Sequence, residues 1–326
     1  VLGLQEDGEW QSVLSELPAG LRDVLLFPGF YKAFEGKEGS PRCFVFRDGD
    51  NLAVYTFLLN EINVLGYELP ELYYDIQAPY GYNGALTTTQ NKSFINKFSR
   101  AFCHYCNESN IIAEMIRFNP VLKNVINMPH VTVMNVLDNV GIDLSMGYET
   151  IWQNSYVKNV RTSIRKAESF GLTFEYYFAK DLSQEKLQWF KTLYWGAMKR
   201  NNAREYYFFS DEFFNSIANE LPHNSLVAFL LHEEEPVTTE WVLFNETVSY
   251  SYLAGTLAEK YHLKANTYLC HKLLPVLIEK GVKYYSIGGG LSRNDSLFAY
   301  KKSFSKDSVC DPIFIGSSIH NKAVYD

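Results

Sequence analysis

A loop with three consecutive glycines is the first segment of this sequence in which residue types and spacing suggest chemistry. The segment Ser286–Gly290 follows an apolar run that predicts a strand, and a short helix with Lys301 and Lys302 is predicted soon after it. Glycines let a ligand approach the backbone closely, and a helix start with nearby lysines attracts anions. Gly289, Lys301 and Lys302 are therefore candidates for an anion or oxyanion site, although a plain tight turn would need the same glycines. The spacing is not that of a phosphate loop or of a dinucleotide motif.

A basic helix face is the second such feature. The helix predicted over residues 152–168 places Lys158, Arg161 and Arg165 on one face, with Lys166 beside them. Like charges at this spacing repel one another, each pair by roughly a few tenths of a kcal/mol. An anion bound to this face would explain the repulsion, so Arg161, Arg165 and Lys166 are candidate substrate contacts. A basic face that is simply solvated is the alternative.

Carboxylates and tyrosines supply the remaining candidates. Glu240 lies in the middle of a predicted strand, where a carboxylate is unfavourable unless it is paired or used in catalysis. We expect either a catalytic role for Glu240 or an edge position with an ion pair. Asp75 precedes a turn rich in glycine and tyrosine, and Tyr80 and Tyr82 in that turn, like Tyr252 in a later strand, are candidate substrate contacts.

Composition and charge limit the class of protein. The chain has 326 residues, of which 47% are hydrophobic and 21% charged, as in a folded protein long enough for two domains. The net charge of −7 argues against a DNA-binding protein. No apolar run of about 18 residues predicts a membrane span. Five cysteines indicate a reducing compartment, hence the cytoplasm, and we expect Cys103 and Cys106 to be buried in a helix and no metal to be bound.

Strands and helices alternate along the chain in an order that predicts mixed sheets. The first half predicts a hairpin, a strand, an amphipathic helix and two strands, at 43–46 with 52–59, 71–76, 91–109, 111–118 and 130–137. The second half predicts a helix, a strand, two helices, three antiparallel strands, a helix, a strand, a short helix and a last strand, at 149–171, 172–178, 183–200, 211–221, 225–256, 262–281, 282–290, 295–304 and 312–315. The fold class expected is α/β with mixed central sheets flanked by helices, in two domains, 1–140 and 141–326.

Four stretches, in this order, resemble the Fem family of non-ribosomal peptidyl transferases and the related acetyltransferase-like proteins of envelope and polysaccharide gene clusters. They are DIQAPYGYNGAL, EMIRFNP, YVKNVRTSIRKAESFGL and YYSIGGGLSRNDSLFAYKKSF, and they extend from Asp75 over most of the chain. The resemblance implies two tandem GNAT-like domains. It implies that Tyr80 and Tyr82 line an acceptor groove, that the basic helix face holds phosphates, and that Lys301 stabilises the oxyanion or the acyl donor.

The activity implied by the resemblance is N-acyl transfer to an amine of a cell-envelope precursor, such as one of peptidoglycan or polysaccharide. No covalent nucleophile is needed, and Glu240 or Asp75 would accept the proton. No tightly bound cofactor is expected. The donor is either aminoacyl-tRNA or acyl-CoA, because the chain lacks both the helical arm of some Fem members and the glycines of the GNAT pyrophosphate loop. The alternative is a catalytically silent double-GNAT protein that binds a nucleotide-sugar or a protein partner.

Overall fold

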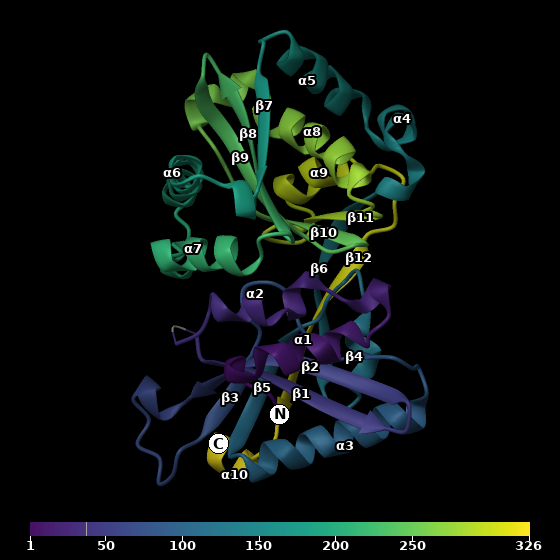
Figure 1. Cartoon of the computed structure of the whole chain (residues 1–326), viewed down its shortest axis with the longest axis vertical. Helices are drawn as coiled ribbons and strands as arrows, with labels where there is room; N and C mark the ends of the chain where they lie inside the picture. The colour runs from purple at the N-terminus through teal and green to yellow at the C-terminus, as the bar shows by residue number, and fades with distance from the viewer. Residues whose placement is uncertain (37) are drawn as a thin grey trace. The chain divides into compact units, whose positions relative to one another are not determined.

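A computed structural model describes residues 1–36 and 38–326, which group into two compact units (Figure 1). Unit 1 consists of Val1–Leu137 and Pro312–Asp326, and unit 2 of Asp138–Asp311. The domain division at residues 140 and 141 stays a prediction. The compact units differ from it in two respects, because the boundary falls after Leu137 and because Pro312–Asp326 group with unit 1. In the described ranges no helix is both long and apolar enough to cross a membrane.

Unit 1 is built on a mixed sheet in the order β1-β2-β3-β5-β12, with the short strand β4 paired to β2. The pair β3 and β5 is parallel and the other pairs are antiparallel. The strands are β1 Ser40–Asp48, β2 Asn51–Glu61, β3 Tyr74–Gln77, β4 Leu86–Thr87, β5 Ile111–Arg117 and β12 Asp311–Ile319. The helices are α1 Asp7–Ser15, α2 Pro28–Lys32, α3 Lys92–Glu108 and α10 Lys322–Tyr325.

Helix α3 supplies the core that holds this sheet. It begins because the Asn91 side chain accepts hydrogen bonds from the backbone N–H groups of Ser93 and Phe94, at 2.8 and 3.4 Å. The predicted apolar stripe packs against the sheet, with Phe94, Ile95, Phe98 and Phe102 buried and Ala101 and Tyr105 partly buried. Cys106 is buried in α3 as expected, whereas Cys103 is only half-buried.

The strands of unit 2 pair in the order β6-β11-β10-β9-β8-β7. Strands β10 and β11 are parallel, and the other neighbours are antiparallel. The strands are β6 Thr132–Asp143, which begins in unit 1, β7 Thr173–Phe178, β8 Ser225–His232, β9 Glu235–Phe244, β10 Val248–Thr256 and β11 Tyr284–Gly288. The α/β class with mixed sheets and flanking helices is therefore confirmed.

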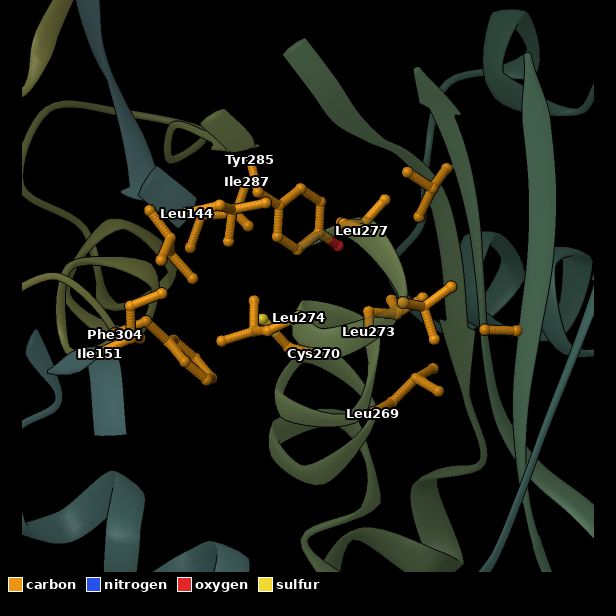
Figure 2. Packing of buried hydrophobic residues seen from close by; sticks show 14 of the residues in the cluster. Leu144, Ile151, Leu269, Cys270, Leu273, Leu274, Leu277, Tyr285, Ile287 and Phe304 are labelled. Atoms are coloured by element: carbon orange, nitrogen blue, oxygen red, sulfur yellow. The ribbon is translucent and has the colours of Figure 1, made fainter. Parts of the chain in front are cut away.

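Helices lie on both faces of the sheet of unit 2. Helix α8 packs on one face, where its leucines meet Tyr285 and Ile287 of β11 in the main core (Figure 2). Helix α6 packs on β9 and β10, where Phe190 and Trp241 stack edge to face. The helices are α4 Tyr148–Thr150, α5 Lys158–Glu168, α6 Gln184–Arg200, α7 Asp211–Glu220, α8 Ala265–Glu279 and α9 Ser296–Lys302.

The single helix predicted over 149–171 is wrong, because the chain forms α4, a π-helix at Ile151–Ser155 and then α5. Tyr156 between them is extended, with ψ at 139°, and is fully buried. Its hydroxyl and that of Tyr148 hydrogen-bond the two ring nitrogens of His271, at 3.1 and 2.8 Å. The backbone breaks because tertiary contacts with α8 outweigh the helical propensity of the segment.

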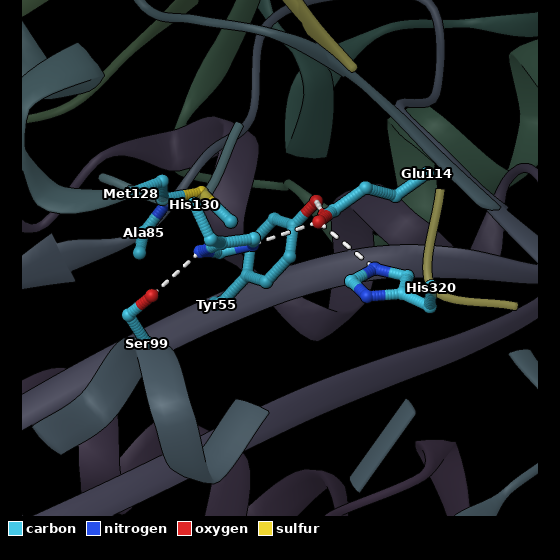
Figure 3. A network of polar contacts seen from close by, with 7 residues as sticks. All are labelled: Tyr55, Ala85, Ser99, Glu114, Met128, His130 and His320. Carbon is cyan, nitrogen blue, oxygen red and sulfur yellow. Dashed lines mark hydrogen bonds and ion pairs between the residues drawn. The ribbon is translucent and has the colours of Figure 1, made fainter. Parts of the chain in front are cut away.

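A buried polar network ties distant segments of unit 1 together (Figure 3). One carboxylate oxygen of Glu114 accepts hydrogen bonds from the Nε2 atoms of both His130 and His320, at 2.8 and 3.1 Å. The other oxygen accepts from the Tyr55 hydroxyl at 3.3 Å, and Ser99 Oγ bonds His130 Nδ1 at 2.9 Å. His320 follows β12, so the network fixes the returning end of the chain to strands and helices formed early in the sequence.

The charges in this network determine its dependence on pH. Burial raises the pKa of Glu114, but the hydrogen bonds and charges of the two histidines outweigh it and lower the pKa below 4.5. Burial lowers the pKa of His320, but hydrogen bonds to Cys103, Cys106 and Glu114 outweigh it and raise the pKa from 6.5 to about 12. The Glu114 contribution to stability is lost as the pH falls through its lowered pKa. The His320 contribution is complete below pH 6.5 and is lost as the pH rises towards about 12.

We predict that Glu114→Gln lowers the free energy of unfolding by about 3–5 kcal/mol at neutral pH, because it leaves a buried imidazolium without its counter-charge. The difference from wild type should shrink as the pH falls from 4.5 through the lowered pKa of Glu114, where the wild-type carboxylate in the folded protein becomes protonated. Urea titrations at several pH values measure both effects.

The matched control is Glu108→Gln, because Glu108 forms an exposed pair with His104 in the same part of the chain. Removing that pair should change the free energy of unfolding by less than about 1 kcal/mol. Equal effects of the two variants would show that the Glu114 network does not stabilise the fold.

Candidate functional site

The parallel strands β10 and β11 of unit 2 pair over only three residues. Val248, Ser249 and Tyr250 pair with Tyr284, Tyr285 and Ser286, and beyond these residues the two strands no longer pair with each other. A register shift between Ser251 and Leu253 marks the point where β10 turns to follow β9 alone. We call this region, from Ser251 and Ile287 onward, the strand separation.

Glu240 of β9 lies beside the strand separation. Its side chain is only 7% exposed, although Ala254, directly opposite it on β10, is exposed. The carboxylate accepts hydrogen bonds from the hydroxyl groups of Tyr285 and Ser251. Burial raises the pKa of Glu240, and these hydrogen bonds and the charge of Lys301 only partly oppose that rise.

Lys301 of α9 reaches the same region from the other side. Its Nζ atom donates a hydrogen bond to the carbonyl oxygen of Gly289 at 2.9 Å. Burial lowers the pKa of Lys301 to about 8, while the charges of Glu240 and Asp295 oppose that change. Gly288 has φ at +77°, and a Cβ atom there would lie 3.1 Å from the Lys301 ammonium nitrogen. A glycine is therefore required both for the turn and for the approach of the lysine.

The rest of the glycine loop folds over the start of α9. Both Asp295 carboxylate oxygens accept backbone hydrogen bonds, Oδ1 from Phe298 at 2.7 Å and Oδ2 from Leu291 and Ser292 at 2.7 and 2.9 Å. These bonds lower the pKa of Asp295. A Cβ atom at Gly290 would meet the Asp295 carboxylate at 2.2 Å. The loop is thus a tight turn that also holds the half-buried Lys301 ammonium group.

The basic helix face has local partners. Arg161 donates a hydrogen bond to the carbonyl oxygen of Tyr156 at 2.6 Å, which caps the broken helix before α5. The Arg165 guanidinium lies 5.6 Å from the ring centre of Trp152, and the Lys166 ammonium 5.9 Å from that of Phe170. Lys158, Arg165 and Lys166 are exposed. An anion contact for Arg161, Arg165 and Lys166 remains a prediction.

The other sequence candidates lie elsewhere. Asp75 is in β3 of unit 1, where the Asn60 amide bonds its carboxylate at 2.9 Å and burial raises its pKa. Tyr80 and Tyr82 follow β3, and burial raises the pKa of Tyr82 to about 12. Tyr252 is buried in β10. Lys302 donates to the carbonyl oxygens of Ser305 and Ser308, so it closes the turn after α9.

The structure therefore brings Glu240, Gly289 and Lys301 together within unit 2 and adds two residues that the sequence did not single out. Tyr285 is fully buried in β11 and Ser251 half-buried in β10. The sequence predicts that both residues lie in strands. It does not predict the register between strands, which brings both hydroxyl groups to Glu240. Among the residues described, no group of histidine, cysteine or acidic side chains is arranged to hold a metal ion.

Comparison with known proteins assigns part of the chain to a known family. Residues 154–302 match the family described as Acetyltransferase (GNAT) domain, and they include Glu240, Tyr285 and Lys301. None of the curated proteins matches the chain.

Three solved structures share the fold over nearly the whole chain. FemX is 14% identical, with 100% of this chain and 98% of FemX covered and a TM-score of 0.71. The C-terminal domain of a putative lysylphosphatidylglycerol synthetase from Agrobacterium fabrum is 14% identical, with 99% and 94% covered and a TM-score of 0.61. A tandem GNAT protein from the clavulanic acid biosynthesis pathway is 10% identical, with 98% and 97% covered and a TM-score of 0.53.

The matched family and the shared fold agree with each other. We conclude that this chain carries a GNAT acetyltransferase domain, has a Fem/GNAT-like fold, and is an acyltransferase.

Proposed function

We propose that the chain transfers an acyl or aminoacyl group to a primary amine of a cell-envelope or polysaccharide precursor in the cytoplasm. The observation that carries this proposal is a buried carboxylate, Glu240, and a half-buried ammonium group, Lys301, whose charges act on each other near the strand separation without forming an ion pair. Titratable groups whose pKa values are displaced by burial are typical of catalytic sites. The FemX and tandem GNAT folds support an acyl transfer reaction, and the acceptor is our inference.

Two side chains supply what acyl transfer to an amine requires. The amine nitrogen attacks the carbonyl carbon, the carbonyl oxygen becomes an oxyanion, and the intermediate then expels the thiolate or alkoxide of the donor. The Lys301 ammonium group, held by the Gly289 carbonyl, is available to stabilise the oxyanion. The Glu240 carboxylate is available to accept the proton that the nitrogen loses, and the leaving group takes up a proton from solvent.

The donor is either acyl-CoA or aminoacyl-tRNA. The matched GNAT domain favours acyl-CoA. Against it, the segment before α8 lacks the glycines of a pyrophosphate loop. The Fem-like fold favours aminoacyl-tRNA. A panel that offers acetyl-CoA and alanyl-tRNA with a range of primary amines distinguishes the two donors.

We predict that Lys301→Ala lowers the rate of acyl transfer by about 10²–10³, because one oxyanion partner is lost. The rate is measured as amide product formed by mass spectrometry with the donor that the panel identifies. Lys302→Ala is the matched control. The Lys302 ammonium group is held by the carbonyl oxygens of Ser305 and Ser308, so this variant should keep a rate near that of wild type.

The same variants test the alternative of a silent binding protein. That alternative predicts no amide product from wild type, and ligand binding that depends on Arg165 and not on Lys301. Wild-type-like turnover by a folded Lys301→Ala protein would refute the catalytic role proposed for this lysine.

We also predict a loss of rate above pH 8 in wild type, because Lys301 loses its charge as the pH rises through its lowered pKa of about 8. Lys301→Arg keeps the charge at all accessible pH values, so the alkaline loss should disappear whatever its maximal rate. A pH–rate profile of kcat for both proteins measures this. If the rate of Lys301→Arg still fell above pH 8 as in wild type, the loss of rate would be due to the titration of another group.

A further inference from the structure

Glu240 is a buried carboxylate without a counter-ion. Among residues 1–36 and 38–326, no lysine, arginine or histidine forms an ion pair with it. The Lys301 charge acts on it from a distance, but the Lys301 Nζ atom is bonded to Gly289. Both hydrogen bonds that Glu240 does receive come from neutral hydroxyl groups, those of Tyr285 and Ser251. A carboxylate in this state is unfavourable in the folded protein and is stabilised strongly by any cation that reaches it.

The residues beside Glu240 on the neighbouring strands are small. On the two strands that flank β9, the residues directly opposite Glu240 are Ala228 and Ala254. Ala228 is fully buried, whereas Ala254 is exposed. The carboxylate is therefore covered by protein on the β8 side and has an alanine open to solvent on the β10 side. We therefore expect a ligand group to reach the carboxylate from the β10 side.

The other carboxylates near the glycine loop and the tyrosine-rich turn differ from Glu240. The Asp295 oxygens are occupied by backbone N–H groups of the loop. Asp75 is bonded by the Asn60 amide. In the network of unit 1, Glu114 has two histidines as partners. Glu240 thus combines burial, lack of a counter-ion and an exposed small neighbour.

We propose that Glu240 binds a primary ammonium group of the substrate at the strand separation and selects amine-bearing substrates over neutral ones of the same shape. An ammonium group has only hydrogen-bond donors and a carboxylate has only acceptors, so the two groups are complementary. The ammonium group can bind Glu240 while Tyr285 and Ser251 keep their hydrogen bonds to the carboxylate. The proposal rests on the proposed acyl transfer, since it makes Glu240 a specificity residue of that site. The ammonium belongs either to the α-amino group of an aminoacyl donor or to the acceptor amine before it loses a proton.

Two matched pairs of probes test the proposal by isothermal titration calorimetry with the full chain. The donor pair is 3′-deoxy-3′-(L-alanylamino)adenosine and its 3′-propionylamino analogue, which differ only in the ammonium group. The acceptor pair is Nα-acetyl-L-lysine amide and Nα-acetyl-L-norleucine amide. We expect the ammonium member of one pair to bind at least about tenfold more tightly to wild type, as charged hydrogen bonds do. That preference should disappear in Glu240→Gln. The pair that shows it identifies the source of the ammonium group.

The control variant is Glu175→Gln, which removes a carboxylate of β7 that is paired with Lys186 and should keep the preference. Should Glu240→Gln fail to fold, Ser251→Ala serves in its place, because it removes one of the two hydroxyl groups that favour the charged carboxylate. It should weaken the ammonium members and leave the neutral members unchanged. Equal affinities within both pairs for wild type, no binding of either ammonium probe, or a preference that survives in folded Glu240→Gln would each overturn the proposal.

The outcomes separate this proposal from the proposed function. Acyl transfer that depends on Lys301, without any ammonium preference, rejects the role of Glu240 alone. An ammonium preference in a protein that forms no amide product supports the binding site and rejects the proposed reaction.

Discussion

The site depends on the short pairing between β10 and β11. Two parallel strands that pair over three residues and then part leave an interruption inside an otherwise continuous sheet. The interruption persists because both strands are held from their other sides, β10 by β9 and β11 by β6, and because α8 packs across that face of the sheet (Figure 2). Backbone groups in a folded protein need partners, so a parted pair of strands is a natural place for an extended ligand. Glu240 and Lys301 take their environment from this one feature.

Burial acts in opposite senses on the two charged groups of the site. It raises the pKa of Glu240 and lowers that of Lys301, so each group is displaced towards its neutral form. If they formed a close ion pair, each would instead hold the other in its charged form. The glycine loop prevents that pair by giving the Lys301 ammonium group a carbonyl partner. Both groups consequently remain available to a substrate that brings charge of its own.

Two buried glutamates, Glu114 and Glu240, differ in their hydrogen-bond partners, and this difference separates a structural role from a functional one. Glu114 and Glu240 are both strand residues and are 3% and 7% exposed. Burial raises the pKa of both carboxylates. In Glu114 the two imidazole partners outweigh burial and lower the pKa, whereas in Glu240 the two hydroxyl groups oppose burial only in part, so its pKa stays raised. The first arrangement is complete without a ligand and connects β2, α3, β5 and the chain end. The arrangement around Glu240 lacks a cationic partner, and a buried carboxylate without such a partner indicates a binding site.

The sequence by itself determined the element types and the candidate residues. Period-2 runs gave the strands, the stripe of Phe94, Phe98 and Phe102 gave α3, and the segment SIGGG gave the loop that meets Lys301. These features are local, because alternation, capping and glycine conformation depend on neighbours in the chain. Glu240 could be singled out for the same reason, as a carboxylate within an apolar strand.

Only the tertiary structure decided which candidates share a site. The break at Tyr156 arises from contacts with His271, more than a hundred positions later in the chain, and no local signal announces it. The convergence of Glu240, Ser251, Tyr285 and Lys301 depends on the register between strands and on the point where β10 and β11 part. The burial that displaces the pKa values also belongs to the packed units and not to any one segment. Local sequence thus determines which side chains are candidates for the site, and long-range packing determines the distances between them and their state of charge.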